Sequence, residues 1–121
     1  YRSFRPAPAS AFAFDVVRRP AVDIATVLGG GWIASGPAVA SRQPRPVWPQ
    51  GLHTLSREAA GEVQTPLQGP AATSLGVGDR VWFRHAKSGE PAERIESYHL
   101  VSGDEIIDEL TTYRGEGKAF L

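Results

Sequence analysis

Glycine and proline interrupt this chain at short intervals, and their spacing restricts what the chain can fold into. The 121 residues include 13 glycines and 10 prolines, which favour many turns and few long helices. Between them lie runs rich in β-branched and aromatic residues, such as Ala11–Arg18 and Asp23–Leu28. The sequence therefore predicts a mainly β (α+β) domain of short, twisted, mostly antiparallel strands.

Further strands are expected where short apolar runs lie between turn signals. These strands are Leu52–Leu55, Gly61–Pro66, Val81–His85, Tyr98–Val101 and Glu105–Leu110. The last two form a hairpin across Ser102-Gly103-Asp104, a loop length typical of hairpins. Single helical turns are expected over Ala71–Leu75 and Glu93–Ser97. An extended connector is expected over Tyr1–Ser10. Irregular chain is expected over Pro37–Gly51, with Trp48 as its anchor, and over Tyr113–Leu121 before a last short strand at 119–121.

Charge and hydropathy exclude several classes of partner. Thirteen basic residues balance thirteen acidic ones, so there is no basic field to hold nucleic acid or an anionic membrane. No apolar run approaches the length of a membrane-spanning helix. The chain has no cysteine, hence no disulfide and no thiolate metal ligand, which fits a reducing, cytoplasmic setting.

Two further absences bear on what the chain is and on its chemistry. The sequence contains no methionine, so residue 1 is not an encoded start, and we expect a piece of a longer protein whose N-terminal part is missing. Lysine occurs only at positions 87 and 118. Chemistry that needs an amine nucleophile therefore has two candidates here.

The stretch Val81–Val101 carries the most candidate chemistry. It places His85 and Lys87 at the end of an expected strand, where alternation puts both side chains on one face. A solvated strand end explains this pair without any function. A polar pair that meets a ligand is the alternative.

Other arrangements of reactive residues have less support. His85 with His53, His99 or Glu90 could supply ligands to zinc, but the spacing matches no closed structural site, and Lys87 does not bind zinc at neutral pH. No serine lies at a Gly-x-Ser-x-Gly elbow. Neighbouring carboxylates are explained as solvated turn residues.

The glycine run Gly29-Gly30-Gly31 directly follows an expected strand. Exposed backbone amides in such a run can bind an anion. Glycines also supply positive φ at a tight bend, and no helix follows to complete a phosphate cradle. Both interpretations stay open at this point.

Three segments together resemble one enzyme family. They are VLGGGWIASGP (27–37), GDRVWFRHAKSGEPAERIESYHLV (78–101) and TYRGEGKAFL (112–121). They resemble the C-terminal part of alanine-racemase-fold enzymes that use pyridoxal 5'-phosphate (PLP). The similarity is to the D-threonine aldolase and D-serine dehydratase-like group, in its amino acid deaminase/aldolase branch, and it extends over almost the whole chain.

The resemblance implies a division of labour between two domains. In that family a (β/α)8 barrel holds PLP on a lysine as a Schiff base, and a C-terminal β domain covers the barrel mouth, often in a homodimer. By this resemblance, residues 1–28 are the end of the barrel and crossing strands. Residues 29–121 are a small antiparallel, β-barrel-like domain.

The resemblance also implies a role for the polar pair. The family carries a metal pair, His-x-Cys or His-x-Asp, at a strand end, and the matching residues here are His85 and Lys87. The histidine is kept, but the second ligand is replaced by an amine, which puts zinc in doubt. The expectation is that Lys87 supplies the positive charge of the metal, with Glu90 or Glu93 setting its protonation state. The Gly29–Gly31 run matches a small-residue turn, and the tail residues Tyr113, Arg114 and Lys118 receive no chemical role.

The sequence therefore predicts the C-terminal domain of a PLP-dependent lyase or racemase that acts on D- or β-hydroxy amino acids, inactive by itself. His85 and Lys87 are the expected catalytic residues. The first alternative is a non-enzymatic β interaction module in which Trp32, Trp48 and Trp82 pack against a partner. The second is a metal-dependent hydrolase in which His53, His85 and His99 converge.

Overall fold

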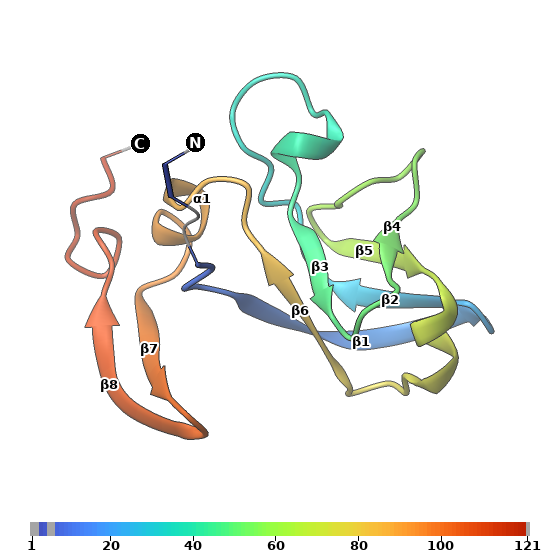
Figure 1. Cartoon of the computed structure of the whole chain (residues 1–121). Helices are drawn as coiled ribbons and strands as arrows, with labels where there is room; N and C mark the ends of the chain where they lie inside the picture. The colour runs from blue at the N-terminus through green and yellow to red at the C-terminus, as the bar shows by residue number, and fades with distance from the viewer. Residues whose placement is uncertain (1–2, 5–6, 121) are drawn as a thin grey trace. The chain divides into compact units, whose positions relative to one another are not determined.

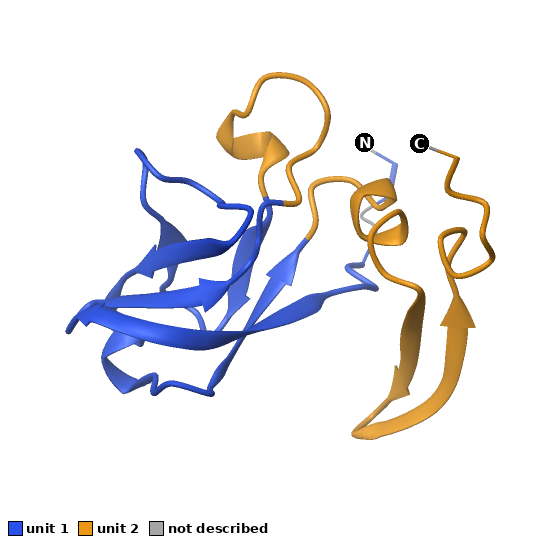
Figure 2. Ribbon diagram, turned by 180° about the vertical axis from the view of Figure 1, so that it is seen from behind, with its two compact units in different colours: residues 1–31, 44–84 blue, residues 32–43, 85–121 orange. Residues whose placement is uncertain are grey.

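The computed structural model describes residues 3–4 and 7–120, and it is mainly β. The chain divides into two compact units, each made from two segments (Figure 2). Unit 1 comprises Tyr1–Gly31 and Pro44–Arg84, and unit 2 comprises Trp32–Gln43 and His85–Leu121. No helix in the described residues is long and apolar enough to cross a membrane.

Unit 1 is a six-stranded antiparallel sheet that curves into a nearly closed, barrel-like form (Figure 1). The strand order is β3-β6-β1-β2-β5-β4. The strands are β1 (Phe12–Ala21), β2 (Ile24–Leu28), β3 (Arg45–Trp48), β4 (His53–Thr54), β5 (Gln64–Gln68) and β6 (Arg80–Arg84), with a 3-10 turn η2 (Pro70–Ser74) after β5.

The longest strand, β1, changes partner along its length. Phe12–Asp15 pairs with β6, and the part from Val16 onward pairs with β2. The β1–β2 pairing contains register shifts on both sides of Arg18. Irregularities of this kind bend a strand and increase its twist, which lets one strand belong to two faces of a curved sheet.

The core of unit 1 combines small aliphatic side chains with a cluster of phenylalanines. Val16, Val27, Leu67 and Val81 are buried, as is Phe83. The ring of Phe83 stacks on Phe12 at 5.6 Å between centroids and meets Phe14 edge-on at 6.0 Å. On β6 the buried Val81 and Phe83 alternate with exposed Arg80 and Trp82, the period expected of a strand with one buried face.

Unit 2 contains little regular structure. It has a 3-10 turn η1 (Ala40–Arg42), one short helix α1 (Gly89–Ala92) and a hairpin of β7 (Ser97–Ser102) and β8 (Glu105–Thr111). The turn of the hairpin contains Gly103 at φ 64°, a left-handed conformation suited to glycine. Every residue of β8 is exposed.

Most of the expected elements are confirmed. β1, β2, β4, β6 and the β7–β8 hairpin lie within one to three residues of their predicted ranges, and η2 occupies the predicted helical turn. β1 and β2, from the segment 1–28, share one sheet with four strands from 29–121. The boundary at residue 28 stays a prediction.

Several local predictions are wrong. The predicted loop Pro37–Gly51 contains β3, and Trp48 is 59% exposed, so it does not anchor that loop. The predicted stop at Pro66 is also wrong, because β5 continues to Gln68. β4 pairs only with Leu67 and Gln68, so Pro66 has a neighbouring strand, β2, on one side only, where proline is tolerated. The helix ends at Ala92, before the predicted range 93–97. Residues 119–120 form no strand; Leu121, like residues 1–2 and 5–6 of the predicted connector, lies outside the described residues.

Two threonines in unit 1 offer a matched test of this core. Thr26 and Thr65 both have no exposed surface. The Thr65 hydroxyl donates to the Gly29 carbonyl at 2.6 Å and accepts from the Gly61 amide at 3.0 Å, whereas the Thr26 hydroxyl has no hydrogen-bond partner among the described residues. A buried hydroxyl without a partner is destabilising.

We expect Thr26→Val to raise the free energy of unfolding by about 1 kcal/mol, and Thr65→Val to lower it by about 1–3 kcal/mol. Urea denaturation followed by circular dichroism measures both. Equal destabilisation by the two variants would show that the Thr26 hydroxyl is hydrogen-bonded in solution.

Candidate functional site

The candidate pair His85 and Lys87 lies directly after β6, in the segment that leads to α1. The strand ends at Arg84, one residue earlier than predicted. Strand alternation therefore does not apply to His85 and Lys87, and their common face stays a prediction. His85 is half-buried, and Lys87 is exposed.

The ammonium group of Lys87 contacts a serine far away in the sequence. Lys87 Nζ donates to Ser35 Oγ at 3.1 Å, across 52 residues. The Ser35 carbonyl accepts a hydrogen bond from the Arg42 guanidinium, and the Ala34 amide donates to the Arg42 carbonyl at 2.7 Å. The loop that holds Ser35 is thus closed on itself by Arg42, which fixes the hydroxyl that Lys87 meets.

This arrangement leaves Lys87 as an exposed cation beside a hydroxyl. A protonated amine has three donors, and only one is used by Ser35. The remaining donors can bind an anionic oxygen such as a carboxylate. Sequence reasoning missed Ser35, because no local pattern connects residues so far apart.

The glutamates expected to control Lys87 lie elsewhere. The described structure gives Lys87 no ion pair with either Glu90 or Glu93. The Glu93 carboxylate lies 3.9 Å from Arg94 Nη2 instead. The prediction that a glutamate sets the protonation state of Lys87 therefore has no contact behind it.

The other histidines do not assemble a metal site. His53 is exposed on β4, and His99 is exposed on β7. Among the described residues, no group of three or more histidine, aspartate and glutamate side chains is placed to hold a metal ion. His85 and His99, both in unit 2, therefore belong to no such group, and His53 lies in unit 1.

The glycine run has a structural explanation in each of its members. Gly29 and Gly30 have φ of +80° and +113°, which L side chains rarely adopt. A Cβ on Gly30 would lie 2.5 Å from Thr65 Oγ1, and one on Gly31 would lie 2.8 Å from the backbone of Glu62. The run is a tight, internally packed bend at the end of β2.

One tyrosine in unit 2 has a perturbed pKa. Burial of Tyr98 on β7 raises the pKa of its hydroxyl, and the neighbouring Tyr113 adds to the rise. Both effects disfavour the phenolate. Tyr98 therefore remains a neutral hydrogen-bonding group throughout the physiological pH range.

Comparisons with known proteins identified no relative of this chain. No protein-family model matches the chain, and the searches of curated proteins and of solved structures found no significant match.

Gly30 and Gly78 allow the packed-bend interpretation to be tested. Both have positive φ, but a Cβ on Gly78 would meet nothing within 4 Å. We expect Gly78→Ala to lower the free energy of unfolding by about 1 kcal/mol through backbone strain alone. Gly30→Ala should lower it by at least about twice as much, because the new methyl group displaces the Thr65 hydroxyl from its two hydrogen bonds.

Chemical denaturation of the two variants gives the comparison. If Gly30→Ala is no more destabilising than Gly78→Ala, the run is not packed against Thr65, and a ligand-binding role for it returns.

Proposed function

We propose that this chain is the C-terminal β domain of a cytoplasmic PLP-dependent lyase or racemase that acts on D- or β-hydroxy amino acids. The observation that carries the proposal is the hydrogen bond between Lys87 and Ser35. Ser35 belongs to the run VLGGGWIASGP and Lys87 to the run GDRVWFRHAK, two of the segments on which the family resemblance depends. Their contact supports the idea that the two segments serve one site.

The exposed hairpin of unit 2 also supports a covering domain. Its apolar side chains Leu100, Val101, Ile106, Ile107 and Leu110 are between 42% and 64% exposed. A two-stranded hairpin with this much exposed apolar surface is marginal in water. In the proposed enzyme, the barrel or a second subunit covers it.

The residues that the structure describes do not by themselves form a PLP site. The space next to the glycine run is occupied by Thr65 and Glu62, so no phosphate fits there. The one α-helix among the described residues has four residues and is too short for a phosphate site at its N-terminus. The proposal therefore assigns the cofactor to a barrel encoded upstream. When bound there, PLP supplies an electron sink for the substrate Cα.

The contribution of this chain is to position the substrate and to move a proton. Lys87, next to Ser35, binds the substrate carboxylate or β-hydroxyl with its remaining N–H donors. His85, two residues away, exchanges a proton with the β-hydroxyl, which suits the neutral pKa range of an imidazole. An ammonium group in place of a metal ligand leaves this donor set unsuited to zinc.

The test uses the product of the complete gene. We expect it to bind PLP and to cleave, dehydrate or racemise a β-hydroxy D-amino acid. His85→Ala should lower kcat about 10²–10⁴-fold, the usual contribution of a general acid or base, with PLP content unchanged. The control His99→Ala, on the exposed hairpin, should keep kcat within about threefold.

Three results would count against the proposal. The absence of PLP from the complete protein removes the family assignment. Stoichiometric zinc that is lost on His85→Ala removes the role given to the Lys87 ammonium. Borohydride reduction followed by peptide mapping should place the cofactor on an upstream lysine, and an adduct on Lys87 would reverse the placement of the domain.

A non-enzymatic interaction module is favoured by a separate observation in unit 1. Trp48 on β3 and Trp82 on β6 are register partners, and they are 59% and 42% exposed. Tryptophan is enriched among the residues that contribute most of the binding energy at the centres of protein interfaces. Trp32, the third residue of that alternative, is half-buried.

If the tryptophan pair binds a protein partner, replacing it should abolish association without unfolding the chain. We expect Trp48→Ser with Trp82→Ser to leave the circular dichroism spectrum intact and to reduce any self-association seen by analytical ultracentrifugation. Trp32→Ser is the control for a tryptophan outside the pair. Unchanged association in the double variant rules the pair out as an interface between copies of the chain.

A further inference from the structure

The tail of unit 2 forms a hollow that the proposed function does not use. It has a volume of about 530 Å³, within the range of small-molecule sites. Its lining comes from the turn after α1 and from the chain after β8: Glu93, Arg94, Tyr113, Arg114, Lys118, Ala119 and Phe120. Three cationic side chains and two aromatic rings thus face one space, against a single carboxylate.

Hydrogen bonds from the side chain and the backbone of Thr112 fix the two walls of the hollow to each other. The buried Thr112 donates through Oγ1 to the carbonyls of Ile95 and Glu96, at 2.5 and 3.1 Å, and its amide donates to Glu96 at 2.9 Å. Gly115 packs so closely that a Cβ there would lie 2.2 Å from the Glu96 carbonyl oxygen. The chain's own contacts therefore set the backbone positions of Tyr113 and Arg114 beside the turn after α1, which reduces the entropy lost on binding.

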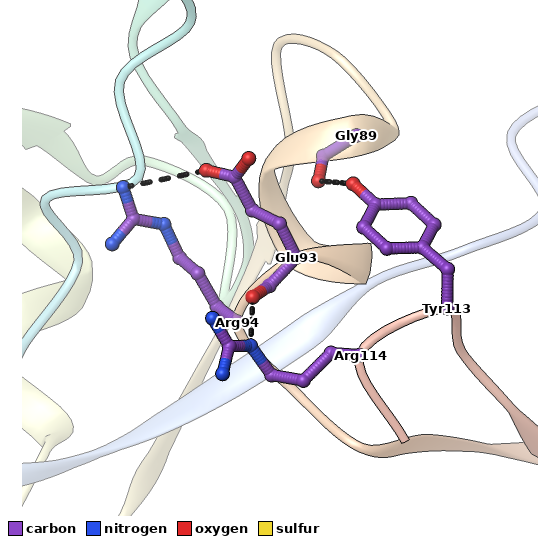
Figure 3. A network of polar contacts seen from close by, with 5 residues as sticks. All are labelled: Gly89, Glu93, Arg94, Tyr113 and Arg114. Atoms are coloured by element: carbon purple, nitrogen blue, oxygen red, sulfur yellow. Dashed lines mark hydrogen bonds and ion pairs between the residues drawn. The ribbon is translucent and has the colours of Figure 1, made fainter. Parts of the chain in front are cut away.

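Two of the lining side chains, Tyr113 and Arg114, are hydrogen-bonded to backbone carbonyls of α1 and of the residue after it (Figure 3). The Tyr113 hydroxyl donates to the Gly89 carbonyl at 2.9 Å, which orients its ring. Arg114 donates through Nε to the Glu93 carbonyl. Its two terminal nitrogens have no hydrogen-bond partner among the described residues.

The charges around the hollow are not neutralised by strong pairs. Arg94 Nη2 lies 3.9 Å from the Glu93 carboxylate, too far for a hydrogen bond. Lys118 pairs with Glu116 at 2.8 Å, but the Lys118 side chain is 65% exposed, and such surface pairs contribute little. An anion in the hollow can thus recruit both guanidinium groups without breaking a strong interaction.

We propose that this hollow binds a small anion that carries a flat ring, either an aromatic phosphate monoester or an aromatic carboxylate. The Arg114 fork and Arg94 hold the anionic oxygens, since a guanidinium matches a carboxylate or phosphate through paired N–H donors. The ring lies against Tyr113 and against Phe120, which is 88% exposed and can cover it. The site does not depend on the proposed enzyme function.

The test measures binding of phenyl phosphate, benzoate and inorganic phosphate to the chain by calorimetry. We expect phenyl phosphate or benzoate to bind at least about tenfold more tightly than inorganic phosphate, because only the first two place a ring against Tyr113 and Phe120. Which of the two binds more tightly identifies the anionic group. Equal affinity for inorganic phosphate and both ring compounds overturns the proposal, as does binding of none of them.

Variants separate this site from general attraction to positive charge. Arg114→Lys keeps the charge but loses the fork, and Arg94→Gln loses a charge; each should weaken binding of the ring anion about tenfold. Arg57→Gln removes an exposed arginine that does not line the hollow, and should change affinity less than about twofold. A nuclear magnetic resonance spectrum of each variant checks that it is folded. Equal weakening by Arg57→Gln in folded protein overturns the proposal.

Discussion

The fold of unit 1 depends on a single strand that changes partners. β1 pairs with β6 up to Asp15 and with β2 from Val16 onward. At the changeover, the Val16 amide donates to the Asp79 carbonyl at 2.7 Å, and the Val16 carbonyl accepts from the Gly78 amide at 2.8 Å. Because both polar groups of the buried Val16 backbone are satisfied, the strand can bend there without leaving an unpaired group in the core. The sheet can then curve towards closure.

The end of β2 depends on a second polar contact inside that curve. The Thr65 hydroxyl joins the Gly29 carbonyl to the Gly61 amide, and the space it occupies is available only because residue 30 lacks a side chain. The glycines therefore serve the close approach of two chain segments. By itself the glycine run suggests a phosphate-binding loop. In this fold its lack of side chains makes room for the Thr65 hydroxyl.

The elements that follow from the sequence are those whose cause is local. The β7–β8 hairpin follows from Gly103 between two β-forming runs, and β6 follows from a short apolar run, Val81–Phe83, between turn signals. β3 does not follow, because proline-rich residues 44–49 become a strand only through pairing with β6, where Pro46 lies opposite Phe83. The sequence likewise predicts Trp48 as the anchor of a loop, whereas in the structure Trp48 is exposed on β3 and paired with the exposed Trp82 of β6. In the candidate site, His85 and Lys87 can be singled out from the sequence because their residue types are suited to chemistry. The contact of Lys87 with Ser35 cannot, because it joins residues that are far apart in the chain.

The two cationic sites in unit 2, at Lys87 and at Arg114, are held by different contacts, and this difference determines what each can bind. Lys87 is an exposed ammonium on a flexible stem, held by one hydrogen bond to a serine. Such a group accepts anions of many shapes and gains selectivity only from what surrounds it in a larger assembly. Arg114 is fixed by a backbone carbonyl, and it lines the hollow together with the Tyr113 ring, whose hydroxyl is bound to another carbonyl. A rigid fork beside a rigid ring discriminates by shape without further help, so selective binding in this chain is expected of the tail rather than of the His-x-Lys pair.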